Sequence, residues 1–137
     1  MSLEPGGFLQ WGETDVPSFR VEKTSPENSG EALTYLFNLS QSRDPRLKPN
    51  WVASLPRMLL ESGLEDVESD IKDAPPHLAL ASHECNLLIH NIFMKKAQDQ
   101  ELVSELEELL DKVARETRQG ACWAFTRWTV IGRKPKA

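Results

Sequence analysis

Two groups of side chains in this sequence combine residue types and spacings that could do chemistry. In the first group, Trp11, Glu13 and Asp15 occupy alternate positions near the start of the chain. A carboxylate held at the end of a strand can orient a hydroxyl or amine of a ligand, or take its proton. Open α/β sheets bind their ligands outside the carboxyl ends of the parallel strands. In the alternative interpretation, Glu13 and Asp15 lie in a solvated loop and Trp11 lies in the core.

The second group contains two of the three histidines, and its chemistry would be metal binding. His83 and His90 stand seven positions apart, which places them on one face of a helix. Glu84 follows His83, but Leu87 stands where an H-E-x-x-H zinc motif needs its second histidine. Cys85 lies on the other side of a helix from His83. The residues therefore predict no metal site, and histidines satisfied by ordinary hydrogen bonds are the simpler interpretation.

The composition predicts a soluble globular domain. The chain has 137 residues, a formal net charge of −5, 39% hydrophobic residues and 27% charged residues, which are ordinary values for one domain. Cys85 and Cys122 are too few for a disulfide framework, and no basic neighbour in the sequence would activate either thiol. No apolar run approaches the roughly 18 residues of a membrane span. Residues 1–15 have no basic cluster before an apolar stretch, so we expect no secretory signal. We expect a cytoplasmic protein with no membrane partner.

Basic charge gathers at the C-terminus. Residues 115–137 carry six basic side chains and one acidic side chain, whereas the rest of the chain is strongly acidic. A basic tail can meet nucleic acid, but no ladder of aromatic and basic residues accompanies this one, and the acidic remainder repels phosphate. We therefore expect no nucleic-acid partner.

The elements that must position these residues are three strands and about four helices. Strand formers favour strands at 8–14, 65–71 and 122–131, of which the last is the longest and the richest in aromatic and β-branched residues. The acidic 65–71 suits an edge, and 8–14 is apolar enough to be buried on both faces. Residues 16–29 are polar, contain Pro17 and Pro26 and predict a loop. Trp123 and Trp128 project to opposite faces of their strand and are expected in the core.

Helical spacing of apolar residues predicts the helices. The first begins after Asn28 or Ser29, which can cap it, and ends before Pro45. The second covers 51–62, provided that Pro56 lies in its first turn, and ends at Gly63. The third and fourth cover 78–97 and 99–118. In the fourth, an apolar stripe lies opposite a glutamate-rich face. The stripe consists of Leu102, Leu106, Leu109 and Val113.

Three stretches carry a family resemblance. The first stretch is the turn Leu3-Glu4-Pro5-Gly6-Gly7, which leads into Phe8-Leu9-Gln10-Trp11. The second contains, in order, Trp51, Leu55-Pro56 and Gly63-Leu64. The third is the closing run Val130-Ile131-Gly132-Arg133-Lys134-Pro135. Together they resemble the C-terminal half of class I S-adenosylmethionine-dependent methyltransferases, of the type found in fungal secondary metabolism. The match departs from the common turn in having Glu4 where lysine is frequent.

The resemblance implies a fold and a topology. It implies an α/β protein with a partial Rossmann-like sheet, in which strand 122–131 is antiparallel and lies between strands 8–14 and 65–71. It also implies a single partial methyltransferase domain over residues 1–137, whose strand 8–14 would pair with a further strand in a whole enzyme.

The resemblance also implies a cofactor and a substrate. S-adenosylmethionine would be the methyl donor and a small secondary metabolite the acceptor, but the sequence lacks the glycine-rich loop that holds the donor, so no cofactor-binding residue is assigned. Trp11, Glu13 and Asp15 would lie at the substrate, and His83, Asn86 and His90 would line a substrate-side insertion. A non-catalytic interaction module, or an inactive remnant, that pairs with a protein partner or a second copy through strand 8–14 is the alternative.

Overall fold

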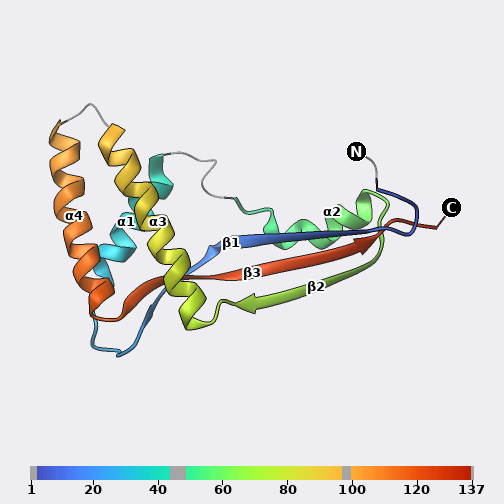
Figure 1. Cartoon of the computed structure of the whole chain (residues 1–137), viewed down its shortest axis with the longest axis horizontal. Helices are drawn as coiled ribbons and strands as arrows, with labels where there is room; N and C mark the ends of the chain where they lie inside the picture. Colours follow the sequence, from blue (N-terminus) through green and yellow to red (C-terminus); the bar gives the residue numbers. More distant parts are fainter. Residues whose placement is uncertain (1–2, 44–48, 97–99, 137) are drawn as a thin grey trace. The chain divides into compact units, whose positions relative to one another are not determined.

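The structure is a computed structural model that describes residues 3–43, 49–96 and 100–136. In chain order its elements are β1 (Phe8–Lys23), α1 (Glu31–Arg43), the 3₁₀ turn η2 (Val52–Ser54), α2 (Leu55–Glu61), β2 (Glu65–Asp73), α3 (Pro76–Lys96), α4 (Gln100–Arg118) and β3 (Ala121–Arg133). Within the described ranges this is an α/β fold of three strands and four α-helices, as the sequence predicts (Figure 1).

The sheet has the strand order β1-β3-β2 (Figure 1). β2 and β3 pair antiparallel, with Glu65 opposite Arg133 and Asp73 opposite Thr126. β1 also runs antiparallel to β3, because hydrogen bonds join Gly6 to Lys134 at one end and Thr24 to Gly120 at the other. The last strand therefore lies between two strands that are parallel to each other, which confirms its predicted central, antiparallel position.

β1 is longer than predicted, because residues 16–23 continue the strand and do not form a loop. Proline tends to be excluded from central strands because it lacks an amide proton, but it is tolerated at an edge, and β1 is the terminal strand of the sheet. Close to Pro17, the amide of Thr126 on β3 donates a hydrogen bond to the hydroxyl of Ser18, 2.7 Å away. The strand continues without a break through Phe19 and Val21 to Lys23.

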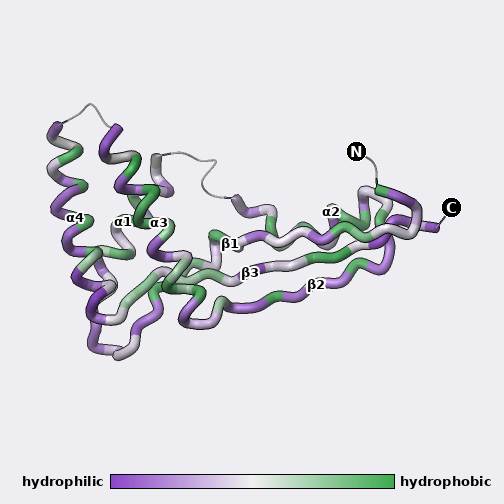
Figure 2. Tube along the Cα trace, in the orientation of Figure 1, coloured by the Kyte–Doolittle hydropathy of each residue, from purple (hydrophilic) through white to green (hydrophobic). Residues whose placement is uncertain are grey.

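The first half of β1 is also more exposed than predicted. Phe8, Leu9 and Trp11 are 64%, 38% and 41% exposed, so the expected burial on both faces is wrong. Apolar composition indicated a buried strand, but burial depends on what covers the strand, and sequence composition does not supply that. Figure 2 shows that the residues of β2, at the other edge of the sheet, are mostly hydrophilic.

Helix ends follow local sequence signals. Pro56 lies in the first turn of α2, where its missing amide proton costs no helical hydrogen bond. Gly63 follows that helix with φ +89°, and Gly120 follows α4 with φ +95°, which is the left-handed conformation that glycine adopts without strain. The predicted stop at Gly63 is confirmed by the end of α2 at Glu61. The predicted stop before Pro45 falls on residues 44–48, which lie outside the described residues.

The chain divides into two compact units. The first unit comprises Met1–Ser18, Lys48–Asp73 and Phe125–Ala137, and the second comprises Phe19–Leu47 and Ala74–Ala124. β1 and β3 contribute residues to both. The core of the first unit is a cluster in which Trp128 packs, partly buried, against the fully buried members Val52, Leu55, Leu59 and Val130.

Trp123 forms the centre of the second unit. Its side chain is 3% exposed, and its indole Nε1 donates a hydrogen bond to the carbonyl oxygen of Leu33, 2.9 Å away. Phe19 and Phe37 both meet the indole edge-on. The predicted core positions of Trp123 and Trp128 are therefore confirmed, each in a different unit.

Gly120 leaves room for a neighbouring side chain, whereas Gly63 has open space beside it. Substituting each glycine by alanine therefore gives a matched pair of variants. A Cβ at residue 120 would collide with the side chain of Thr24, whereas a Cβ at residue 63 meets no atom within 4 Å. Gly63→Ala should cost about 1–2 kcal/mol of unfolding free energy from the left-handed backbone alone. Gly120→Ala should cost clearly more in chemical denaturation. Equal losses for the two variants would contradict the steric role.

Candidate functional site

The predicted residues of β1 form a small exposed cluster in the first unit. The Trp11 indole Nε1 lies 3.5 Å from Glu13 Oε2, and the amide of Thr14 donates to Glu13 Oε1 at 3.2 Å. Trp51 contacts Trp11 edge-on, with ring centroids 6.0 Å apart. Asp15 accepts the Ser18 hydroxyl at its backbone oxygen, and its side chain is half-buried. The arrangement offers a carboxylate beside an exposed indole, which suits a ligand with an apolar ring and a hydroxyl or amine.

The sequence predicted that this cluster lies at the carboxyl end of its strand, and that prediction is wrong. β1 ends at Lys23, so Trp11, Glu13 and Asp15 lie in its first half. The prediction failed because it ended the strand at residue 14, and the rule about strand ends depends on where the strand stops.

His83 is a packed core histidine of the second unit. It is 1% exposed. The Thr117 hydroxyl donates to the carbonyl oxygen of Val113 at 3.0 Å, so its oxygen accepts a hydrogen bond from the N–H at His83 Nε2, 2.9 Å away. That assigns the imidazole proton to Nε2 and leaves Nδ1 to accept the amide of Trp123 at 3.5 Å. Burial lowers the pKa of His83, and both nitrogens are satisfied in the neutral ring.

His90 and Asn86 lie further along α3. His90 Nδ1 lies 2.8 Å from the carbonyl oxygen of Asn86, and His90 Nε2 lies 2.5 Å from the hydroxyl of Ser40 on α1. The Asn86 side chain donates to the carbonyl oxygen of Ser82 at 3.0 Å. His83 and His90 both contact the Trp123 ring edge-on, at centroid distances of 5.7 and 5.6 Å. Their predicted common helix face is therefore confirmed, and that face packs on Trp123.

The two groups of predicted site residues belong to different units. Trp11, Glu13 and Asp15 lie in the first unit, and His83, Asn86 and His90 lie in the second. In the first unit Trp11 and Glu13 are neighbours, and in the second unit His83 and His90 contact the same Trp123 ring. Among the described residues, no three histidine, cysteine, aspartate or glutamate side chains gather as a metal site would require.

The cysteines differ in environment. Cys85 is exposed, while Cys122 is half-buried. Burial, with a smaller contribution from the nearby Glu22, raises the pKa of the Cys122 thiol, so its thiolate fraction at neutral pH is small.

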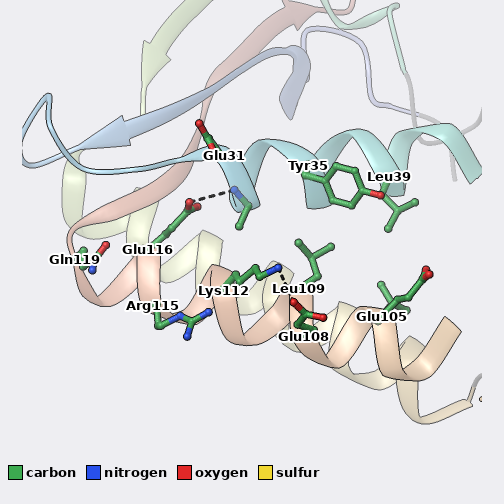
Figure 3. Close-up of a pocket in the computed structure, with 12 residues that line it drawn as sticks. Glu31, Tyr35, Leu39, Glu105, Glu108, Leu109, Lys112, Arg115, Glu116 and Gln119 are labelled. Atoms are coloured by element: carbon green, nitrogen blue, oxygen red, sulfur yellow. Dashed lines mark hydrogen bonds and ion pairs between the residues drawn. The ribbon is translucent and has the colours of Figure 1, made fainter. Parts of the chain in front are cut away.

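Sequence patterns did not reveal a groove between α1 and α4 in the second unit (Figure 3). Its volume is about 790 Å³, within the range of ligand pockets. Leu106 and Leu109, from the predicted apolar stripe, line it together with Tyr35 and Leu39 of α1. Charged side chains also line the groove. Among them, Lys112 Nζ forms an ion pair with Glu108 Oε1, 2.7 Å away. The stripe was visible in the sequence, but its partner helix was not. The side chain of Leu102 lies outside the described residues.

Glu116 lies at one end of this groove and is 7% exposed. Its carboxylate accepts the hydroxyl of Ser29 and the amides of Ala32 and Leu33, the last two at 3.1 and 3.0 Å. Burial acts to raise the pKa of Glu116, but the hydrogen bonds from Ser29 and from the amides at the start of α1 outweigh it and lower the pKa. Glu116 thus caps α1 from a distant helix, satisfying amides that have no helical partner.

Comparison with known proteins gives no family assignment. No protein-family model matches this chain, and no curated protein matches it. Among the described residues, no helix has both the length and the apolar character needed to cross a membrane.

The Glu116 cap can be tested by substitution. Glu116→Gln removes a charge that accepts buried amides and should lower the free energy of unfolding by about 1–3 kcal/mol at neutral pH. Glu108→Gln, on an exposed face of the same helix, serves as the control and should leave stability nearly unchanged. Because the folded-state pKa is depressed, the stabilisation is present above the unfolded pKa of about 4.3. The difference from wild type should therefore shrink as pH falls through the folded-state pKa, in urea titrations at several pH values.

The neutral His83 predicts a second pH dependence. The unfolded chain binds a proton near pH 6.5, whereas the folded chain resists it. Stability should therefore be full above that pH and decline as the pH falls below it. His83→Gln should flatten this decline in thermal unfolding curves, and His77→Gln, at an exposed position, should preserve it. A decline that persists unchanged in His83→Gln would refute the assignment.

Proposed function

We propose that this chain forms the C-terminal half of an S-adenosylmethionine-dependent methyltransferase that acts on a small secondary metabolite. The sequence support is the Pro5-Gly6-Gly7 turn before β1 and the run from Val130 to Pro135 that closes β3. A cofactor-binding half with a glycine-rich loop would be needed for activity, and this sequence holds no such loop after a strand.

One observation carries the proposal, namely the position of β3. Consecutive strands usually lie side by side, yet β2 and β1 are separated by the last strand of the chain. The family resemblance implies this insertion, with the inserted strand antiparallel to both neighbours. Composition alone would favour a central β3 without requiring that it separate two parallel strands.

Methyl transfer requires only a few functional groups from this half of the enzyme. Direct displacement at a methyl group needs alignment and exclusion of water, with no covalent enzyme intermediate. In this proposal the Glu13 carboxylate orients the substrate hydroxyl or amine, or takes its proton, while Trp11 packs against the apolar part of the substrate. S-adenosylmethionine would supply the methyl group from the other half.

A second candidate function is a non-catalytic interaction module that docks a protein through the outer edge of β1. The observation favouring it is the exposure of Phe8, Leu9 and Trp11 on a terminal strand. Soluble proteins usually cover or charge such an edge. This function needs no cofactor.

Calorimetry with S-adenosylmethionine tests the methyltransferase proposal. The isolated chain should show no saturable binding. A chimaera that places the cofactor-binding half of a class I methyltransferase before Met1 should bind saturably and methylate a small acceptor, and Glu13→Gln in the chimaera should reduce turnover more than binding of the donor.

The donor half alone, without this chain, is the control. A chimaera that is folded by circular dichroism but neither binds nor transfers would contradict the proposal. Micromolar binding by the isolated chain would contradict the need for a second half.

A further inference from the structure

The sheet has two unlike edges. β1 forms one of them, and its residues from Phe8 to Gly12 carry no charge and are exposed. β2 forms the other, and five of its nine residues are acidic, with only Ile71 exposed as a large apolar side chain. Acidic side chains discourage the pairing of strands at an edge. The β1 edge therefore favours pairing with a further strand, whereas the acidic β2 edge disfavours it.

We propose that the β1 edge pairs antiparallel with β1 of a second copy of this chain, about a two-fold axis at Gln10. The inference rests on the second candidate function and names its partner. A two-fold interface uses the same surface on both copies, so the edge must be complementary to itself. The sequence of β1 meets that condition in the register centred on Gln10.

In the register centred on Gln10, apolar and small residues face each other. Leu9 lies opposite Trp11 of the second copy, and Phe8 lies opposite Gly12 of the second copy. Apolar pairs across antiparallel strands stabilise the pairing, and an aromatic side chain covers the gap that a strand glycine leaves. Each contact occurs twice because of the symmetry.

The charges favour the same register. Glu13 and Asp15 lie beyond the paired residues 8–12, because the positions that would face them in the second copy precede its β1. No two acidic side chains therefore face each other directly. A register centred on Glu13 or on Thr14 would oppose Glu13 to Glu13 or to Asp15, and like charges directly opposite are destabilising. Pro17 has no amide proton and limits the pairing at the other end of the segment.

Sedimentation over a range of concentrations tests the association. The wild-type chain should form a dimer, and Trp11→Lys should shift it to monomer by at least tenfold in the dissociation constant. Ile71→Lys makes the same kind of change on the β2 edge and should leave the dimer intact. Circular dichroism of both variants separates lost pairing from lost folding.

Disulfide trapping tests the register independently of any destabilised variant. In a Cys85→Ser background, Gln10→Cys places the two new thiols directly opposite, at a Cα separation that a disulfide spans. Thr14→Cys, also exposed on β1, would place its two thiols on the order of 25 Å apart. Mild oxidation should cross-link the first variant and spare the second.

Three results would overturn the dimer: a monomer at every concentration, equal cross-linking of the two cysteine variants, or dissociation by Ile71→Lys as strong as by Trp11→Lys. None of them bears on S-adenosylmethionine binding by the chimaera, so failure of the dimer and failure of the methyltransferase proposal are distinguishable.

Discussion

The hydrogen bond from the Trp123 indole to the Leu33 carbonyl oxygen is the interaction on which the second unit depends. A buried indole needs a partner for its N–H, and this one finds it on α1. The same ring contacts His83 and His90 of α3 edge-on. One side chain of β3 therefore fixes two helices against the strand, and a smaller residue at this position would leave a cavity.

The Glu116 carboxylate of α4 is a second long-range partner of α1. Trp123 binds a carbonyl within that helix, and Glu116 binds amides at its start. Both partners come from elements far away in the sequence, so α1 is held by long-range polar contacts as well as by its buried apolar residues Leu33 and Leu36. Because these groups are buried, each is costly to leave unpaired.

Local signals in the sequence predicted much of the fold. The aromatic run of β3, Pro56 in a first turn and Gly63 after a helix all have a mechanism that acts within a few residues, and each was found where expected. The length of β1 was not predicted, because tolerance of Pro17 depends on the strand lying at an edge. The cap by Glu116 and the groove between α1 and α4 were not predicted either, since both depend on which helices meet.

The candidate site shows the same division. Spacing placed His83 and His90 on one face, but only the fold shows that this face packs on Trp123. The position of Trp11, Glu13 and Asp15 along β1 depended on the end of the strand, which local composition misjudged. The insertion of β3 was expected through the family resemblance, and the apolar content of the strand independently favoured a central position. It is the feature that the methyltransferase proposal uses.

The acidic residues of β2 have a consequence for how far this sheet can grow. A molecule with two receptive edges would add copies head to tail without limit, as fibrils do. Here Glu68 and Asp70 make one edge repellent to a strand that carries acids of its own, such as Glu13. Growth of the sheet can therefore proceed on one side only, and any assembly through it closes after a single addition.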